Sequence, residues 1–253
     1  MLTEDELARY IRQIDLTTLG AKGQGKLKQS SVLIVGCGGL GSIASLYLAG
    51  AGVGHIGLLD YDKVEISNLH RQIIYRTKCL GEYKVEAARE ELQQINYEIK
   101  ISLHQLKITT NTNIDDLIAN YECVLDGTDD LAVKLLLNKA CYRQKKPLFH
   151  GGVSQWGGQV TSIVPPLAEL PCLACFSDNI DGGIQADNRL LEGILGPVCG
   201  LIASIQAMEV IKFIIKEKVL SGKLLLIDGK DLNFTFIQLK KNPHCSVCAE
   251  IKG

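Results

Sequence analysis

A glycine-rich turn between an apolar strand and a helix constrains the fold of this chain more than any other feature. The run Val32 to Val35 is apolar throughout, as in a buried parallel strand, and Leu40 to Ala51 is rich in small residues, as in a tightly packed helix. Glycines between such elements let a phosphate approach the backbone, and a helix N-terminus favours its negative charge. The turn therefore predicts nucleotide binding by Gly36, Gly38, Gly39 and Gly41.

The strand predicted next, His55 to Asp60, ends in a carboxylate. In nucleotide-binding βαβ units, an acidic residue at about this distance from the glycines accepts hydrogen bonds from ribose hydroxyls. Asp60 therefore supports nucleotide binding, while the glycine pattern leaves the identity of the nucleotide open. The alternative is that the glycines only allow a helix to pack closely on a strand.

Strands and helices alternate up to about residue 150, after a polar helical lead-in over residues 4–29. This order favours a parallel sheet with helices on both faces. The remaining elements predicted in this half are Lys84 to Ile95 (helix), Ile99 to Leu103 (strand), Glu122 to Asp126 (strand), Leu131 to Gln144 (helix) and Pro147 to Gly151 (strand).

The second half has a different pattern. Gln159 to Val164 predicts a strand, and Leu224 to Asp228 with Phe234 to Leu239 predicts a hairpin. Between them lie an irregular stretch, residues 165–196, and a long helix, Val198 to Lys216. We therefore expect a Rossmann-like α/β fold whose mainly parallel sheet is extended by antiparallel strands in the C-terminal half.

Composition narrows the possible classes of protein. The 253 residues are 46% hydrophobic and 22% charged, with a formal net charge of -1, so nonspecific nucleic-acid binding is not expected. The longest apolar run, Ile202 to Ile215, is interrupted by Gln206, Glu209 and Lys212, and the acidic N-terminus does not resemble a signal peptide. We expect a cytoplasmic protein.

Four cysteines form two CxxC pairs, which are Cys172 with Cys175 and Cys245 with Cys248. Four thiolates suit tetrahedral zinc (Zn2+), and a closed site of this kind is structural because it leaves no position open for substrate. The alternative is four separate thiols or two redox pairs. The other cysteines are expected to be ordinary buried residues: Cys37, Cys79, Cys123, Cys141 and Cys199.

Four further runs resemble signatures of the ThiF/MoeB/HesA family, relatives of ubiquitin-activating enzymes. They are Arg9 to Gln13, Asp60 to Gln72, Gly81 to Glu86 and Asp126 to Asp129, in the family's order. With the two CxxC pairs, the resemblance covers essentially the whole chain. It implies a single adenylation domain over residues 1–253, divided into a helical arm (1–30), a nucleotide-binding half (31–151) and a partner-binding half (152–253).

The resemblance also implies an activity. A carboxylate is a poor electrophile until it becomes a mixed anhydride with AMP, and this step needs cations around the α-phosphate. We expect an adenylyltransferase that uses ATP to adenylate the C-terminal carboxylate of a ubiquitin-like sulfur-carrier protein (ThiS/MoaD-like), as in thiamine or molybdopterin biosynthesis, and releases pyrophosphate.

The family's pattern assigns catalytic roles to four residues. Lys84 stabilises charge on the α-phosphate, Arg71 contacts phosphates, Asp129 binds magnesium (Mg2+), and Arg12 comes from the second subunit of a homodimer. The nucleotide-binding set that the resemblance implies is Gly36, Gly38, Gly39, Gly41, Asp60, Asp62, Ser67, Asn68, Arg71, Gln72, Lys84, Thr128 and Asp129.

Each of these assignments has an ordinary alternative. Lys84 opens an amphipathic helix, where lysine is usually solvated, and Arg71 has the alternative of a surface ion pair. Asp129 precedes a predicted helix and is also a candidate for its cap. Arg12 has the alternative of a polar helix face, and Asp62 that of a turn residue.

The sequence departs from the family at two positions. Aligning Gly193 to Pro197 with the family's Gly-x-x-x-Pro segment places Arg189 where some relatives have a cysteine that forms acyl intermediates. A protonated guanidinium is no nucleophile, so we expect no covalent adduct and an external sulfur donor. Asp130 stands where relatives commonly have asparagine after the magnesium-binding aspartate.

Three other functions remain as alternatives. A related enzyme would adenylate another carboxylate, at a peptide C-terminus or on tRNA. An NAD-dependent dehydrogenase shares the glycine turn but needs neither Lys84 nor the run around Arg71. A non-catalytic protein-binding scaffold would have no use for Arg71, Lys84 and Asp129 together.

Overall fold

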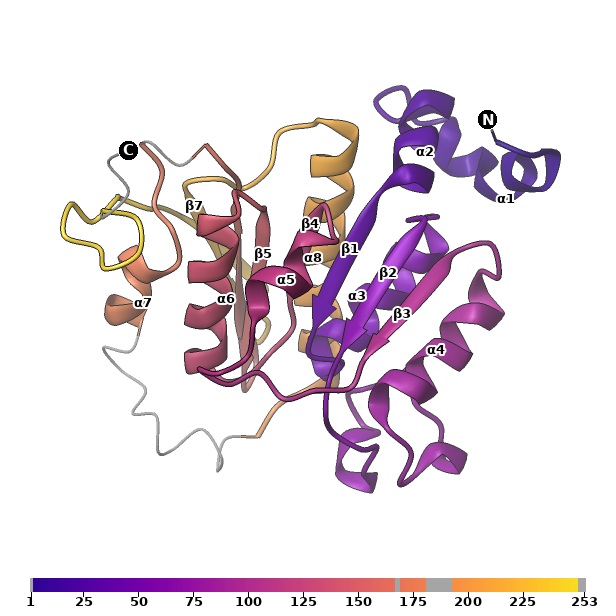
Figure 1. Ribbon diagram of the computed structural model, residues 1–253, viewed down its shortest axis with the longest axis horizontal. Coiled ribbons are helices and arrows are strands. Elements are labelled where there is room, and N and C mark those ends of the chain that lie inside the picture. The colour runs from indigo at the N-terminus through magenta and orange to yellow at the C-terminus, as the bar shows by residue number, and fades with distance from the viewer. Residues whose placement is uncertain (1, 167–168, 181–192, 250–253) are drawn as a thin grey trace.

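The computed structural model describes residues 2–166, 169–180 and 193–249, which form one mixed sheet with helices on both faces (Figure 1). The eight-stranded sheet has the order β3-β2-β1-β4-β5-β6-β7-β8. The strands are β1 (Ser31–Val35), β2 (His55–Leu59), β3 (Lys100–His104), β4 (Cys123–Asp126), β5 (Leu148–Ser154), β6 (Gly157–Ile163), β7 (Lys223–Asp228) and β8 (Asn233–Gln238).

The first five strands pair in parallel, and the last three extend the sheet in antiparallel register. The predicted fold class and the predicted hairpin, β7 with β8, are therefore confirmed. The helices are α1 (Glu4–Ile14), α2 (Gly20–Gln29), α3 (Gly39–Gly50), α4 (Lys84–Ile95), α5 (Ile114–Ala119), α6 (Leu131–Arg143), α7 (Ala174–Ile180) and α8 (Gly196–Ile215), with short 3-10 turns at Ile66–Asn68 and Thr77–Cys79.

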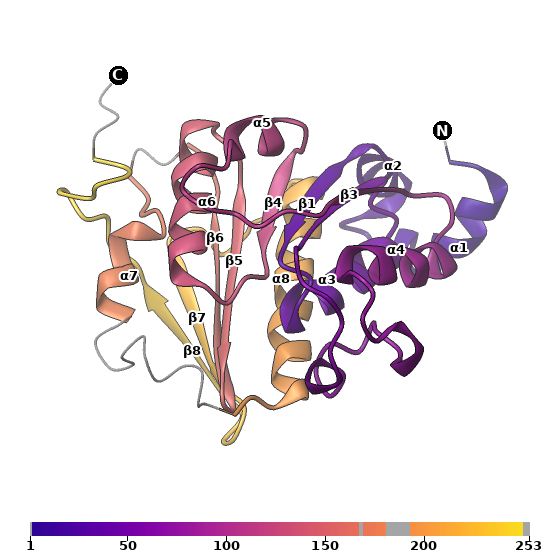
Figure 2. The same ribbon diagram turned by 60° about the horizontal axis from the view of Figure 1, so that its bottom comes forward.

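Two apolar layers sandwich the sheet. In β1, Val32 and Ile34 join the cluster beneath α3, α4 and α8, while Leu33 and Val35 join the cluster beneath α5 and α6. Figures 1 and 2 show α6 and α8 on opposite faces of the sheet. Alternation within a strand that is buried on both faces explains why β1 reads as a continuous apolar run.

Helix α8 has the length and composition of a membrane span, and half of its apolar window is buried inside the structure. Its polar residues serve the interior of the protein. Gln206 Nε2 donates to the carbonyls of Asp126 (2.9 Å) and Phe149 (3.1 Å), while a Glu209 carboxylate oxygen accepts from Ser162 Oγ at 2.7 Å. The residues that interrupt the apolar run thus anchor α8 to the sheet.

The structure adds detail to the predicted helices. The helical lead-in predicted over residues 4–29 consists of two helices, because α1 ends at Ile14 and α2 begins at Gly20, where φ is +60°. Helices α5 and α7 were not predicted. Each is short, with only six or seven residues, and α7 lies inside the stretch that the sequence describes as irregular.

Two backbone segments approach each other very closely at Gly41 in α3. A Cβ at Gly41 would lie 1.8 Å from the Gly36 carbonyl oxygen, and one at Gly127 would lie 2.9 Å from the Gly41 nitrogen. The ends of β1 and β4 and the start of α3 therefore meet without side chains between them.

We predict that Gly41→Ala destabilises the protein by about 3 kcal/mol, because the added methyl group overlaps a backbone carbonyl that has no room to move. Gly50→Ala is the matched control, since Gly50 lies in the same helix with open space around its Cβ position. Alanine there should be neutral or stabilising by up to about 1 kcal/mol. Urea unfolding measures both, and equal stability of the two variants would contradict the prediction.

Candidate functional site

The glycine turn lies at the carboxyl end of β1, and Asp60 fixes its shape. Gly36 has a φ of +85°, which favours glycine. Asp60 Oδ2 accepts from the Cys37 backbone N–H at 2.7 Å, and Oδ1 accepts from the Asp62 backbone N–H at 2.8 Å. Each oxygen keeps a second lone pair for a ligand hydroxyl. Burial raises the pKa of Asp60, and the charge of Lys84 opposes that shift.

Lys84 is buried at the start of α4, with only 6% of its surface exposed. Its Nζ donates to Asp62 Oδ2 at 2.9 Å, and its backbone N–H donates to the Asp62 carbonyl at 2.9 Å. The alternative of a solvated surface lysine is therefore wrong. Asp62 holds the lysine beside Asp60, where a cation can meet an anionic ligand.

Arg71 and Gln72 lie against the glycine turn. A Cβ at Gly39 would be 3.8 Å from Arg71 Cδ, and one at Gly38 would be 3.7 Å from Gln72 Nε2. Arg71 Nη1 donates to the Ser67 carbonyl at 2.9 Å. Gln72 is buried, and its Oε1 has no hydrogen-bond partner within the described residues.

Ser67 and Asn68 shape the loop that carries Arg71. Asn68 Oδ1 accepts from the Glu65 backbone N–H at 3.2 Å, and the Ser67 hydroxyl lies 3.4 Å from Glu65 Oε2. The Arg71 backbone N–H then donates to the Asn68 carbonyl at 3.1 Å. These two residues fold the loop locally, in addition to any contact they make with a ligand.

Thr128 follows β4 and lies against the same turn, and the exposed Asp129 comes next in the chain. The Thr128 nitrogen is 3.0 Å from the position of a Cβ on Gly36. The cap of α6 is Asp130, whose Oδ1 accepts from the Ala132 backbone N–H at 2.8 Å. The alternative that Asp129 caps this helix is therefore wrong, and its exposed carboxylate remains available to a cation.

Arg12 lies apart from this cluster. It is exposed on α1, and the adjacent Gln13 donates to the Ala51 carbonyl at 3.0 Å, beyond the C-terminal end of α3. The glycine turn lies at the N-terminal end of the same helix. Within one chain the structure does not bring Arg12 to the turn.

A buried polar network behind Thr128 was not predicted from the sequence. Asp126 Oδ1 accepts from the Thr128 backbone N–H (3.1 Å) and hydroxyl (2.7 Å), while Oδ2 receives Lys134 Nζ at 3.0 Å and contacts His150 Nδ1 at 2.8 Å. Lys134 Nζ also donates to the Gly151 carbonyl at 2.8 Å. The network ties β4, β5 and α6 together directly beneath the loop that carries Asp129.

Charge in this network is fixed by its partners. Burial disfavours the Asp126 carboxylate, but the charge of Lys134 and the His150 hydrogen bond outweigh it and hold the pKa of Asp126 below its usual range. Burial, reinforced by the Lys134 charge, lowers the pKa of His150. Asp126 is therefore ionised and His150 neutral at neutral pH.

The four cysteines of the two CxxC pairs come together as predicted. All four are buried, and their Sγ atoms lie within 4.8 Å of one another. Tetrahedral zinc with Zn–S bonds of about 2.3 Å separates its sulfurs by roughly 3.8 Å. The Cys172–Cys175, Cys172–Cys245 and Cys175–Cys248 sulfurs are 4.0, 3.6 and 3.3 Å apart, so the set fits such an ion.

The remaining cysteines are buried, as predicted. Cys199 packs in the first turn of α8, where its Sγ would be 2.9 Å from a Cβ on Gly39, and burial raises the pKa of its thiol. Arg189, aligned with the cysteine position of some relatives, lies outside the described residues.

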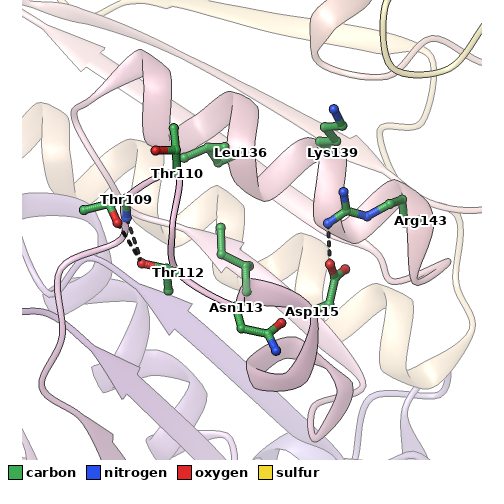
Figure 3. A pocket seen from close by; sticks show the side chains of 9 residues that line it. Thr109, Thr110, Thr112, Asn113, Asp115, Leu136, Lys139 and Arg143 are labelled. Carbon is green, nitrogen blue, oxygen red and sulfur yellow. Dashed lines mark hydrogen bonds and ion pairs between the residues drawn. The ribbon is translucent and has the colours of Figure 1, made fainter.

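A separate polar pocket lies between the 109–113 loop, α5 and α6 (Figure 3). Its walls include Thr109, Thr112, Lys139 and Arg143, and Arg143 pairs with Asp115. None of the residues around the glycine turn contributes to it. The cluster at the turn is therefore the candidate functional site.

The fold and the site define a class of nucleotide-binding proteins, with a Rossmann-like sheet, a glycine turn, a buried lysine and two pairs of cysteines. Comparison with known proteins identifies the family of this chain. The ThiF family profile matches residues 10–247, and the chain belongs to this family. The predicted ThiF/MoeB/HesA resemblance is thereby confirmed.

Among relatives, the "adenylyltransferase and sulfurtransferase MOCS3" of Culex quinquefasciatus is 45% identical over 251 residues, which are 98% of this chain and 57% of that protein. The protein of the same name in Dictyostelium discoideum is 39% identical over 252 residues, 98% of this chain and 59% of that protein. The chain thus spans less than two thirds of the length of these relatives.

Among solved structures, E. coli MccB with succinimide is similar at 31% identity and a TM-score of 0.83, over 95% of this chain and 74% of that one. E. coli MccB with ATP is similar at 28% identity and a TM-score of 0.79, over 98% of this chain and 82% of that one. These likenesses agree with the fold class.

We predict that neutral His150 makes stability depend on pH. Its folded pKa lies below the ordinary value of about 6.5, so as pH falls below that value the unfolded chain binds a proton that the folded chain does not. Stability should therefore fall on acidification from pH 7 to pH 5. In His150→Gln, which can still donate to Asp126, this slope should be shallower.

Urea unfolding at both pH values measures the slope. Exposed His70, changed in the same way to glutamine, serves as the matched control and should keep the wild-type slope. If His150→Gln also keeps it, the buried histidine takes up a proton in the folded protein and the prediction is wrong.

Proposed function

We propose that this chain uses ATP to adenylate the C-terminal carboxylate of a small ubiquitin-like sulfur-carrier protein, as in molybdopterin biosynthesis. One observation carries the proposal: the fold brings Arg71, Lys84 and Asp129 to a glycine turn at the start of α3. The names of its MOCS3 relatives support adenylyl transfer. The glycine turn alone would also suit a dehydrogenase, but that chemistry needs no such set of charges.

The residues suit the charges of the reaction. In the proposed arrangement, backbone N–H groups of the turn and the N-terminus of α3 bind phosphates, and Asp60 accepts from the ribose. The carrier's carboxylate oxygen attacks the α-phosphorus, the bond from that phosphorus to the oxygen bridging to the β-phosphate breaks, and pyrophosphate leaves. Lys84 and Arg71 offset the charge that accumulates.

Asp129 is the proposed ligand of Mg2+, which screens charge on the phosphates when bound. The exposed Asp129 carboxylate is free of the helix-capping role that Asp130 performs. Because Thr128 is fixed to Asp126, the backbone on the N-terminal side of Asp129 is held in one conformation before the nucleotide arrives.

We propose that the active unit is a homodimer in which Arg12 of one chain reaches the site of the other. Two points support this proposal. Arg12 lies beyond the far end of α3 in its own chain, and the family's pattern assigns an arginine at this position to the second subunit.

The four-cysteine centre is proposed to hold structural zinc. Four buried sulfurs at tetrahedral spacing leave no open position for substrate. We also propose a cytoplasmic location, where reducing conditions keep the thiols available to the metal. An external sulfur donor would act on the adenylate, because the cysteines described at the turn, Cys37 and Cys199, are buried and burial raises the pKa of both thiols.

A second candidate substrate follows from the solved structures. "Microcin C7 biosynthetic enzyme MccB" was solved "in complex with N-formylated MccA" at 27% identity and a TM-score of 0.76 to this chain. This likeness keeps open a carboxylate other than that of a sulfur carrier. Candidate carriers that end in Gly-Gly, tested beside such alternatives, separate the two by which one drives pyrophosphate exchange.

We predict that wild-type protein catalyses ATP–pyrophosphate exchange with its carrier and that Lys84→Ala lowers the rate by roughly 100-fold, as for loss of one preorganised charged group. Lys100→Ala is the control, because Lys100 is exposed at the start of β3, at the opposite end of the sheet. An unchanged rate in Lys84→Ala would contradict the proposed mechanism.

The same assay tests the shared site. Arg12→Ala protein mixed with Lys84→Ala protein should recover part of the activity, because one of the two sites in a hybrid dimer is intact. No recovery, in samples that native mass spectrometry shows to contain hybrid dimers, would assign Arg12 to the protein surface only.

We predict about one zinc per chain, and that Cys245→Ser lowers the free energy of unfolding by several kcal/mol, because metal binding is linked to folding. The control is Ser246→Ala, at an exposed position next to the ligand. Cys123→Ser would not serve as a control, because it would bury a new hydroxyl group. Elemental analysis and urea unfolding of protein purified without chelator measure both. Absence of metal from folded, stable protein would refute the prediction.

A further inference from the structure

Helix α6 contacts both the buried network around Asp126 and the four-cysteine centre. Near its start, Lys134 Nζ donates to Asp126 Oδ2 at 3.0 Å and to the Gly151 carbonyl at 2.8 Å. One turn later, Asn138 Nδ2 donates to Cys172 Sγ at 3.6 Å, and Asn138 Oδ1 accepts from the Leu173 backbone N–H at 3.0 Å. Both side chains are buried, with 6% and 1% of their surfaces exposed.

The two contacts share one face of one helix. Residues four positions apart stand above each other on a helix, so Lys134 and Asn138 are joined by a single rigid turn. The helix begins directly after Asp129, because Asp130 is its cap. Near its other end, the Tyr142 hydroxyl donates to the Cys248 carbonyl at 3.4 Å. Helix α6 is therefore attached to the loop that carries Asp129 at its start and to both cysteine pairs further along.

The Lys134 contact extends to the loop itself. Asp126 accepts from Lys134 through one oxygen and from the Thr128 backbone and hydroxyl through the other. Without the lysine, burial would favour protonation of Asp126, and a protonated carboxyl is a weaker acceptor for Thr128. The conformation of residues 127–129 thus depends on a cation that α6 carries.

We propose that Lys134 and Asn138 are positioning residues that fix the proposed Mg2+ ligand Asp129 relative to the four-cysteine centre. Both residues are buried, and their side-chain polar atoms contact other groups of the chain. Lys134 acts through Asp126 and Thr128, and Asn138 acts through Cys172 and the α6 backbone. The inference rests on the proposed function, because it concerns the site that this function assigns to Asp129.

The test follows two readouts in the purified holoprotein. One is the dependence of pyrophosphate exchange on Mg2+ concentration, and the other is the half-time of metal release into excess chelator. The variants are Lys134→Met, Lys134→Arg and Asn138→Asp, the last of which keeps the acceptor for Leu173 and removes the donor to Cys172. The matched control is Lys139→Met, the same change on the exposed side of α6, beside the pocket in Figure 3.

We expect each substitution to affect the site that the substituted side chain does not contact, as well as the one that it does. Groups that orient metal ligands are typically worth about 10–100-fold in affinity or activity, so Asn138→Asp should raise the half-saturating Mg2+ concentration by about 10-fold as well as hasten metal release. Lys134→Met should do the same, with a larger effect on Mg2+. Lys134→Arg keeps the charge and both hydrogen bonds and should recover most of the loss, while Lys139→Met should match the wild type.

Two results would overturn the inference. One is an Asn138→Asp protein that releases metal faster yet responds to Mg2+ as the wild type does. The other is a Lys134→Met protein that is indistinguishable from Lys139→Met. If Lys134→Met does not fold by circular dichroism, Lys134→Gln takes its place, and the Asn138 arm decides the outcome independently.

Failure of the proposed function looks different. In that case the wild type itself catalyses no exchange with any carrier. The coupling is then measured by calorimetry of ATP binding with and without Mg2+, and by metal release from the Lys134 variants, neither of which needs a partner protein. If these measurements show no coupling between Mg2+-dependent ATP binding and metal release, the inference is wrong, whatever the outcome for the proposed function.

Discussion

Direct backbone contact between the ends of two neighbouring strands is the constraint on which the rest of the structure depends. Gly36, Gly41 and Gly127 leave no side chain between β1, α3 and β4. This proximity lets Asp60 reach the turn from β2 and sets Thr128 and Asp129 beside it from β4. A single bulky residue at the junction would separate the phosphate-binding backbone from the groups that act on the phosphate.

Burial of charge is the second organising force. A carboxylate as fully buried as Asp126 costs several kcal/mol of desolvation, which its partners must offset. Those partners come from α6 and β5 and from its own loop, so three elements are fixed in relation to one carboxylate. Lys84 and Asp62 repeat the arrangement on the other side of the turn, at a half-open position where a ligand can enter.

The sequence predicted those parts of the fold that depend on local pattern. The periodicity of α4 predicted a helix, and the two CxxC pairs predicted that four cysteines come together. Lys134 was not identified, because a lysine within a helix ordinarily points to water. Its role depends on the register of the sheet, in which Asp126 pairs with His150 across β4 and β5. Short α5 and α7 owe their helical form to packing and carry too few residues for a periodic signal.

The four-cysteine centre joins Cys172 to Cys245, which are 73 positions apart along the chain. The entropy lost in closing a loop grows only with the logarithm of its length, so each doubling costs roughly 0.6 kcal/mol more. The centre therefore fixes where that long segment begins and ends while tolerating insertions and deletions inside it. Loops inside the segment can therefore change in length at little cost, whereas α8, β7 and β8, which also lie inside it, are held by their contacts with the sheet.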